Sequence, residues 1–246
     1  MNARRNAKLA PFLLNDGLKH DAVLIFPGGG YQHVSVVKEG VAVARAWNSE
    51  GFNAYVLNYR VKPASGHEIL SDAVHAVQDV KSSLRESGSG EGKLAVMGFS
   101  AGGHLTLMSE QHWDEITDDP QNVGADALIL CYPVVSFRDP YAHQGSRMNF
   151  IGEKNANDVE LIDKYSAELH IGPDFPPTFI WHCEGDKTVP VENSRMLHDA
   201  LDNAGVSNRL LTYPDGAHGL GLARRYPEIS GWFGEAAAWL KEQFAD

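Results

Sequence analysis

Apolar residues in this chain gather in six short runs, separated by longer stretches of mixed apolar and polar character. Most of the runs are continuously apolar, which is typical of strands that are covered on both faces in a parallel sheet. The pattern therefore predicts six buried strands: Ala22–Phe26, Ala54–Tyr59, Leu94–Met97, Ala127–Tyr132, Thr178–Cys183 and Arg209–Tyr213.

Stretches with helical spacing lie between these strands. One of them places apolar residues three or four positions apart with polar residues between: Ile69, Ala73, Val77, Val80 and Leu84. The expected helices are Lys38–Glu50, Glu68–Ser87, Gly103–Gln111, Glu192–Ala204 and Ile229–Phe244. Because strands and helices alternate, we expect an α/β fold with a mostly parallel, right-handed, doubly wound sheet of about six to eight strands and helices on both faces.

The stretch from Val134 to Pro177 interrupts this alternation. It has no clear strand, and glycine, proline, asparagine and aromatic residues are frequent in it. A long irregular stretch inside a compact domain is usually functional. Since no linker, repeat or low-complexity tract divides the chain, we expect a single domain over residues 1–246, with a lid-like or edge excursion at about 134–177.

Composition and charge narrow the classes of partner. The formal net charge of −11 repels nucleic acid and anionic lipid, and no run of lysine and arginine offsets it. The apolar stretch Leu9–Leu14 is short and contains a proline, which makes it a poor signal peptide. Cys131 and Cys183 lie in strand-like runs and are expected to be buried thiols, with a disulfide as the less favoured alternative. We therefore expect a cytoplasmic protein with no nucleic-acid or membrane partner.

The segment GFSAGGHL at residues 98–105 follows a predicted strand and precedes a predicted helix. It has the form G-x-S-x-G, which in this context indicates a nucleophile elbow with Ser100 as the nucleophile. Taken alone, the segment also fits a small serine in a tight connection.

A serine hydroxyl needs a base to take its proton, and the base needs a carboxylate that orients it. In hydrolases of this organisation the acid and then the histidine follow the serine, each after a later strand. Asp186 follows the strand Thr178–Cys183, and His218 follows Arg209–Tyr213. Asp186 is the preferred acid because Gly185 frees the turn before it, although Glu184 and Asp215 are nearby carboxylates.

A glycine-rich loop, PGGGY at residues 27–31, follows the strand Ala22–Phe26. It lacks the Gly-Lys-Ser/Thr ending of a phosphate-binding P-loop and the spacing of a dinucleotide fingerprint. Its glycines suit a backbone that approaches an acyl carbonyl closely. We expect an oxyanion hole formed by the N–H groups of Gly29 or Gly30 together with that of Ala101.

These motifs, with LNYR at 57–60, PPTFIWHCEGDKTVPVENS at 176–194 and PDGAHGLGL at 214–222, resemble those of the α/β-hydrolase superfamily over nearly the whole chain. Within its esterase and lipase group, the chain is most similar to small acetyl-esterase-like proteins described as carbohydrate or xylan esterases. The resemblance implies an α/β-hydrolase fold and the roles given above for Ser100, Asp186 and His218. Two departures are Pro27, where many relatives have histidine, and a portion before Ala22 that looks too short for two leading strands.

We therefore expect a serine hydrolase that cleaves short-chain carboxylic esters through an acyl-enzyme, with acetyl esters of sugars suggested by the resemblance alone. A serine amidase or peptidase is the main alternative, and a non-catalytic binding protein of the same fold is a weaker one. The expected partner is a small-molecule ester, no metal or organic cofactor is expected, and a homo-oligomer is left open. Tyr31 and His67 are candidate substrate-binding residues.

Overall fold

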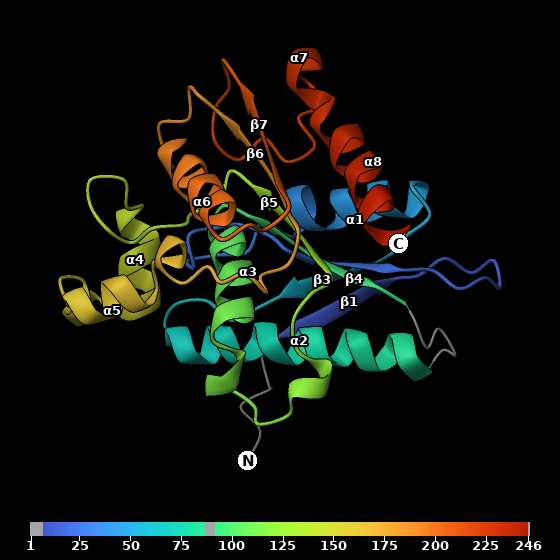
Figure 1. The fold of residues 1–246 in the computed structure, drawn as a ribbon, viewed down its shortest axis with the longest axis horizontal. Helices are drawn as coiled ribbons and strands as arrows, with labels where there is room; N and C mark the ends of the chain where they lie inside the picture. Colours follow the sequence, from blue (N-terminus) through green and yellow to red (C-terminus); the bar gives the residue numbers. More distant parts are fainter. Residues whose placement is uncertain (1–6, 87–91, 246) are drawn as a thin grey trace.

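The computed structural model describes residues 7–86 and 92–245, which build a seven-stranded sheet with helices on both sides (Figure 1). The strands are β1 (Lys8–Phe12), β2 (Ala22–Phe26), β3 (Asn53–Asn58), β4 (Leu94–Phe99), β5 (Ala127–Cys131), β6 (Thr178–Cys183) and β7 (Asn208–Tyr213). Their order across the sheet is β1-β3-β2-β4-β5-β6-β7. Only β1 is antiparallel to its neighbour, and every other pair is parallel. The sheet confirms the predicted α/β class.

Six of these strands coincide with the predicted runs to within two residues. The seventh, β1, was not predicted. It pairs through one side only, with β3, and its side chains are exposed or half-buried. An edge strand of this kind lacks the continuous apolar run that marks a buried strand, and it tolerates Pro11, whose missing N–H would break a ladder in the sheet interior.

The helices are α1 (Ala42–Ser49), α2 (Gly66–Glu86), α3 (Ala101–Gln111), α4 (Gln144–Ile151), α5 (Val159–Lys164), α6 (Glu192–Asn203), α7 (Pro227–Ser230) and α8 (Trp232–Phe244). Shorter helical turns are η2 (Val36–Val41), η3 (Trp113–Glu115), η4 (Pro120–Asn122), η5 (Glu153–Asn155) and η6 (Ala167–Leu169). The helix predicted from Lys38 begins as the π-helical turn η2, and the one predicted over Ile229–Phe244 is divided into α7 and α8. Ser87, the last residue predicted for α2, lies outside the described residues.

The core lies in two layers, one on each face of the sheet. Successive residues of a strand face opposite sides, so Leu24 and Phe26 of β2 join one layer while Val23 and Ile25 join the other. Helices α2, α3 and α6 cover the first face, and α1 and α8 cover the second (Figure 1). Every residue of β2, β4, β5 and β6 is buried, as expected for strands between two helical layers.

Both cysteines are buried and neither forms a disulfide. Among the described residues, no helix combines the length and the apolar character that a membrane crossing requires. Residues 134–177 contain no strand, and they form α4, η5, α5 and η6 beside α3 and α6 in Figure 1.

Candidate active site

Ser100 occupies a sharp turn between β4 and α3. Its backbone has φ 54° and ψ −120°, a conformation that a residue other than glycine adopts only under strain. A Cβ atom on Gly98 would lie 2.3 Å from the Gly102 carbonyl oxygen, and one on Gly102 would lie 2.0 Å from that of Phe26. The turn is therefore possible only with glycine at both positions. This close packing is the geometry that the G-x-S-x-G segment predicted.

Two hydrogen bonds connect Ser100 to the other predicted site residues. The Oγ of Ser100 lies 2.7 Å from Nε2 of His218, and Nδ1 of His218 lies 2.6 Å from Oδ2 of Asp186. Because a carboxylate can only accept, Nδ1 carries the proton and donates it to Asp186. Nε2 is then an acceptor and receives the hydrogen bond of the Ser100 hydroxyl. The structure thus brings together the three residues that were proposed as nucleophile, base and acid.

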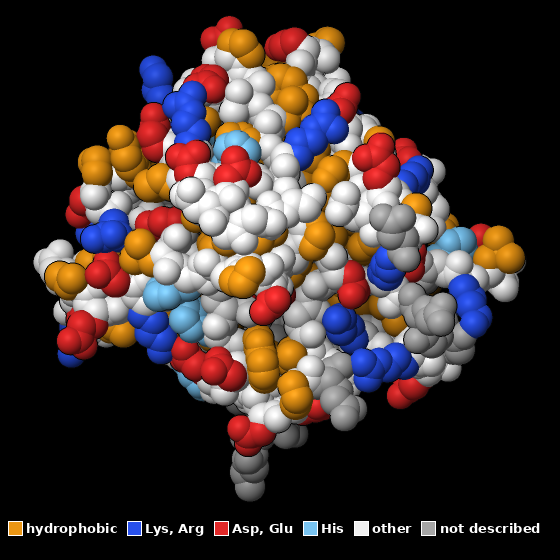
Figure 2. All heavy atoms as spheres, viewed as in Figure 1, with side chains coloured by type: hydrophobic (Ala, Val, Ile, Leu, Met, Phe, Trp, Pro, Cys, Tyr) orange, Lys and Arg blue, Asp and Glu red, His pale blue; other side chains and the backbone are white. Residues whose placement is uncertain are grey.

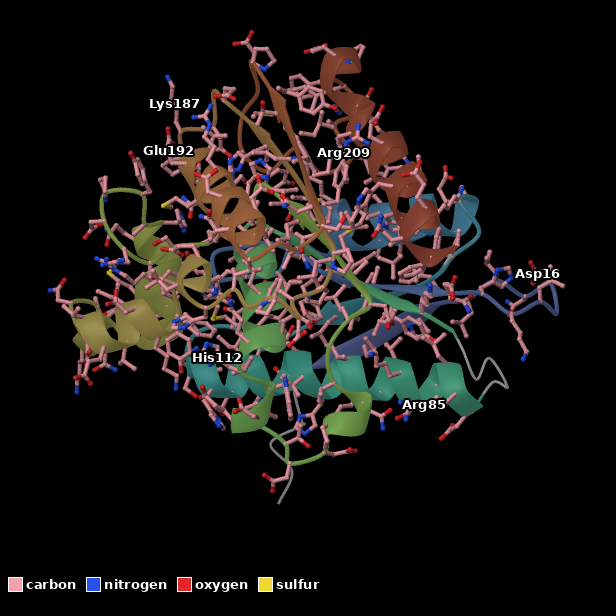
Figure 3. The ribbon with its side chains drawn as sticks, viewed as in Figure 1. Asp16, Arg85, His112, Lys187, Glu192 and Arg209 are labelled. Atoms are coloured by element: carbon pink, nitrogen blue, oxygen red, sulfur yellow. The ribbon has the colours of Figure 1, made fainter. Side chains whose placement is uncertain are left out.

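The two rival carboxylates lie outside this arrangement. Glu184 forms an ion pair with Arg195, and Asp215 is exposed to solvent. Only Asp186 of the three contacts His218. In Figure 3, Lys187 and Glu192 mark the segment that follows β6, at the end of the molecule opposite Asp16 and Arg85. The site therefore lies at the carboxyl ends of the parallel strands, where open α/β sheets carry their ligands.

Asp186 is held in place by several donors. Its Oδ1 accepts hydrogen bonds from the backbone N–H groups of Thr188 at 2.8 Å and Val189 at 3.0 Å. Nε2 of the buried His182 lies 3.3 Å from Oδ2 while also donating to the Val189 carbonyl. Burial alone raises the pKa of Asp186, but the hydrogen bonds from His182 and His218 outweigh it and lower the pKa well below its ordinary value. Asp186 is therefore a carboxylate across the whole physiological pH range.

The glycine-rich loop lies across the cleft from Ser100. Gly29 and Gly30 both have positive φ, 137° and 63°, and a Cβ on Gly29 would lie 2.0 Å from the carbonyl oxygen of His33. Within the described residues, the N–H groups of Gly29, Gly30 and Ala101 donate to no other residue. By contrast, the N–H of Gly28 is engaged by Glu39 at 2.9 Å. The three predicted oxyanion-hole residues therefore keep their donors available.

Glu39 is a buried carboxylate that the sequence reasoning missed. It lies in η2, is only 4% exposed, and lines the cleft. While Oε2 accepts from Gly28, Oε1 accepts from the hydroxyl of Tyr132 at 2.7 Å. That hydroxyl also accepts from the N–H of Gly221, so one link joins the glycine-rich loop to the loop that carries His218. A signal for Glu39 was present, because helical spacing places it on the same face as Val36 and the buried Val43.

A cleft of about 390 Å³ opens above Ser100 and His218. The irregular segment at 134–177 contributes His143, Gly145 and Asn149 to its lining. Asn149 donates to the carbonyl of Gly30 at 2.8 Å and so holds the glycine-rich loop. His143 caps α4 by accepting the N–H of Ser146 on Nδ1, and burial lowers its pKa. These residues carry no sequence signal, since their positions depend on how the segment folds back over the cleft.

The two residues proposed to bind substrate do not line this cleft. Tyr31 is fully buried, and its hydroxyl donates to Nδ1 of His104 at 2.7 Å, while Nε2 of His104 donates to the carbonyl of Tyr165. Burial lowers the pKa of His104 to about 4, which keeps this interior histidine neutral. His67 is exposed in the first turn of α2. Of residues 27–31, Gly29 and Gly30 line the cleft and Tyr31 does not.

The described residues contain no group of three or more histidine, cysteine, aspartate or glutamate side chains arranged to hold a metal ion. The polar groups around Ser100 are instead a base, a carboxylate and backbone donors. Such a constellation can activate a hydroxyl and stabilise a developing oxyanion.

Comparisons with known proteins agree with this geometry. The BD-FAE family model matches residues 14–201. The chain is 33% identical over 235 residues to endo-1,4-beta-xylanase B of Butyrivibrio fibrisolvens, covering 92% of this chain and 36% of that protein. It is 31% identical over 222 residues to an acetylxylan esterase of Xylanibacter ruminicola, covering 89% of this chain and 45% of that protein. The chain thus spans less than half the length of both curated relatives.

A solved structure is similar over nearly its whole length. The acetyl ester-xyloside bifunctional hydrolase of Caldicellulosiruptor lactoaceticus is 36% identical, with a TM-score of 0.83, and the match covers 95% of this chain and 87% of that one.

Proposed function

Because this chain belongs to the BD-FAE family and is an esterase-like α/β-hydrolase, we propose that it hydrolyses short-chain carboxylic esters through a Ser100-His218-Asp186 triad. The observation that supports this most is the continuous pair of hydrogen bonds from Ser100 to His218 and from His218 to Asp186, at the edge of a cleft. Because the Asp186 carboxylate can only accept, the His218 proton lies on Nδ1, which leaves Nε2 free to take the proton of Ser100.

In the first half of the reaction, Nε2 of His218 takes the proton of Ser100 while Oγ attacks the ester carbonyl carbon. The carbonyl oxygen becomes an oxyanion, stabilised by the N–H groups of Gly29 or Gly30 and of Ala101. The imidazolium is stabilised by Asp186. His218 then gives its proton to the leaving alcohol as the carbon–oxygen bond breaks, which leaves an acyl group on Ser100.

In the second half, His218 takes a proton from a water molecule, whose oxygen attacks the acyl carbon. Collapse of the second oxyanion breaks the bond to Ser100, and His218 returns the proton to Oγ. One ester and one water become one alcohol and one acid, and the enzyme is restored without any redox change.

The substrate class is supported by the relatives and by the site. An acetylxylan esterase and an acetyl ester-xyloside hydrolase are among the similar proteins, which favours acetyl esters of sugars. The cleft of about 390 Å³ is lined mostly by polar residues and glycines, including Gln32, His143 and Asn149. Polar donors and acceptors of this kind suit hydroxyl-bearing alcohols more than long lipid chains.

The test compares wild type with Ser100→Ala on p-nitrophenyl acetate, acetylated xylose and the corresponding N-acetyl amino sugar. We expect turnover of the esters by wild type and a loss of roughly 10³-fold or more in kcat for the variant. Ser230→Ala, which alters a hydroxyl on α7, is the control and should retain wild-type kcat. Full turnover by Ser100→Ala would exclude Ser100 as the nucleophile, and preferential cleavage of the amide would favour an amidase.

A further inference from the structure

A second hollow of about 530 Å³ adjoins the active-site cleft. Its floor is apolar, since Leu220, Leu222 and Ala223 line it and are each less than a tenth exposed. Tyr226, which is 41% exposed, adds an aromatic ring to the lining. A hollow with an apolar floor and an exposed aromatic side chain suits a ring-shaped ligand.

The two hollows are continuous along the chain. Lys38 lines both of them, and the adjacent residues Gly219 and Leu220 line one each. The segment from Gly219 to Tyr226 thus leads from the proposed base, His218, along the second hollow. A ligand that occupies the active-site cleft can therefore extend into the second hollow past Lys38.

The rim of the second hollow is positively charged. Lys38, Arg224 and Arg225 line it, and no aspartate or glutamate does. None of the three cations has a hydrogen bond or an ion pair from its side chain to any residue in the described part of the chain. In the neighbouring cleft, the carboxylate of Glu39 is already engaged by Gly28 and Tyr132. Three uncompensated cations around one hollow stand out on a chain of net charge −11, whose acidic and basic side chains are interspersed on the face in Figure 2.

The position of the hollow also indicates which part of a substrate enters it. In the proposed mechanism, His218 gives its proton to the leaving alcohol, so the alcohol must lie on the His218 side of the scissile bond. The hollow begins at the residues that directly follow His218. It therefore lies on the side of the leaving alcohol.

Building on the proposed function, we propose that the second hollow binds the alcohol portion of the substrate and selects alcohols whose ring carries a carboxylate. The ring packs on the apolar floor and Tyr226, and the carboxylate pairs with Arg224, Arg225 and Lys38. Guanidinium groups bind carboxylates through two parallel hydrogen bonds, which a neutral amide of the same shape cannot match. Sugar acids and hydroxybenzoic acids share this chemistry.

The test uses two pairs of acetate esters that differ only in charge. One pair is 4-acetoxybenzoate and 4-acetoxybenzamide, and the other is an acetylated methyl glucosiduronic acid and its carboxamide. In wild type, we compare kcat/KM for the acid with kcat/KM for the amide of the same pair. We expect Arg224→Gln/Arg225→Gln to lower this acid-to-amide ratio by roughly tenfold, because KM for the acid rises. Turnover of the amides should stay within about twofold of wild type. The pair that shows the effect identifies the sugar or the aromatic source.

The control is Lys8→Gln/Lys154→Gln, which removes two positive charges from residues that line neither hollow. An unchanged acid-to-amide ratio in the arginine variant, or an equal change in the control, would overturn the inference. Binding is measured separately in Ser100→Ala by calorimetry with 4-hydroxybenzoate and 4-hydroxybenzamide, and with the two deacetylated sugars. If the acids bind more tightly than the amides and this preference is lost without Arg224 and Arg225, the proposed role of the second hollow is supported even if wild type hydrolyses no ester. If wild type hydrolyses the esters but shows no such preference, only the proposed function is supported.

Discussion

Asp186 illustrates how far a single residue depends on its partners. Its carboxylate fixes the proton of His218 on Nδ1, because that nitrogen must donate while Nε2 accepts from Ser100. In Asp186→Asn the amide can present its N–H₂ group to the imidazole, which favours the tautomer with the proton on Nε2. We expect kcat on p-nitrophenyl acetate to fall roughly 10³- to 10⁴-fold. The circular dichroism spectrum should stay that of the folded wild type.

The matched controls for this variant are Asp215→Asn and Glu184→Gln, since both carboxylates lie near the site in sequence and neither contacts His218. Each should keep kcat within about threefold of wild type. If kcat fell as far in Asp215→Asn as in Asp186→Asn, the assignment of Asp186 as the acid would be wrong. These variants test which of the three neighbouring carboxylates orients His218, a choice for which the sequence offered three candidates.

At the residue scale, sequence reasoning predicted the three residues of the proposed triad and missed the groups that hold their loops in place. Ser100, Asp186 and His218 each follow a strand within a recognisable motif, so their order and spacing identified them. Glu39 and Tyr132 act through contacts between segments 93 residues apart, and no local pattern encodes such a pairing. Tyr31 was misplaced because its motif fixes the backbone of the loop but not the side of the loop on which its ring lies.

At the scale of elements, the junction of β4 with α3 depends on glycine. Gly102→Ala would place a methyl group 2.0 Å from the Phe26 carbonyl oxygen, in backbone that cannot yield without moving β2. We expect a loss of about 3 kcal/mol or more in the free energy of unfolding, measured by urea titration.

Gly234→Ala is the opposite case and serves as the control. Gly234 lies inside α8, and nothing lies within 4 Å of a Cβ added there. Alanine loses less backbone entropy than glycine when a helix forms, so the free energy of unfolding of this variant should rise by about 0.5 to 1 kcal/mol. If Gly102→Ala proved as stable as Gly234→Ala, the result would contradict the close approach of α3 to β2 at Gly102.

Elements with a strong periodic pattern were predictable, and the others were not. The buried parallel strands and the long helices α2, α6 and α8 each carry a continuous apolar run or an apolar face. The edge strand β1 and the short helices α4 and α5 carry neither, because β1 and α5 bury no residue and the buried residues of α4 include the polar Ser146 and Arg147. Yet α4 and its N-cap residue supply Asn149 and His143 to the cleft, so one of the least predictable elements shapes the substrate side of the site.

At the scale of the whole molecule, buried ionisable groups make folding sensitive to pH. Glu110, at the end of α3, is partly buried and accepts hydrogen bonds from the N–H of Ala125. Burial raises its pKa from 4.5 to about 7, although the hydrogen bond from Ala125 and the charge of Lys81 oppose the rise. Between these two pKa values the folded protein binds a proton that the unfolded chain has released. The free energy of unfolding therefore falls as the pH rises across this window.

Glu110→Gln removes this dependence and keeps an oxygen that can accept from Ala125. We expect the free energy of unfolding of the variant to rise relative to that of wild type, by about 1 to 2 kcal/mol, as the pH rises from 5 to 8. One pKa unit corresponds to about 1.4 kcal/mol, and residual contact of Glu110 with water reduces the effect. Urea unfolding at several pH values measures the difference, and Glu242→Gln on α8 supplies a control with the same change in net charge at an exposed position. A constant difference between Glu110→Gln and wild type from pH 5 to 8 would show that Glu110 does not titrate in this range. A difference that grows only in Glu110→Gln would place the origin of the pH dependence at the junction of α3 with β5.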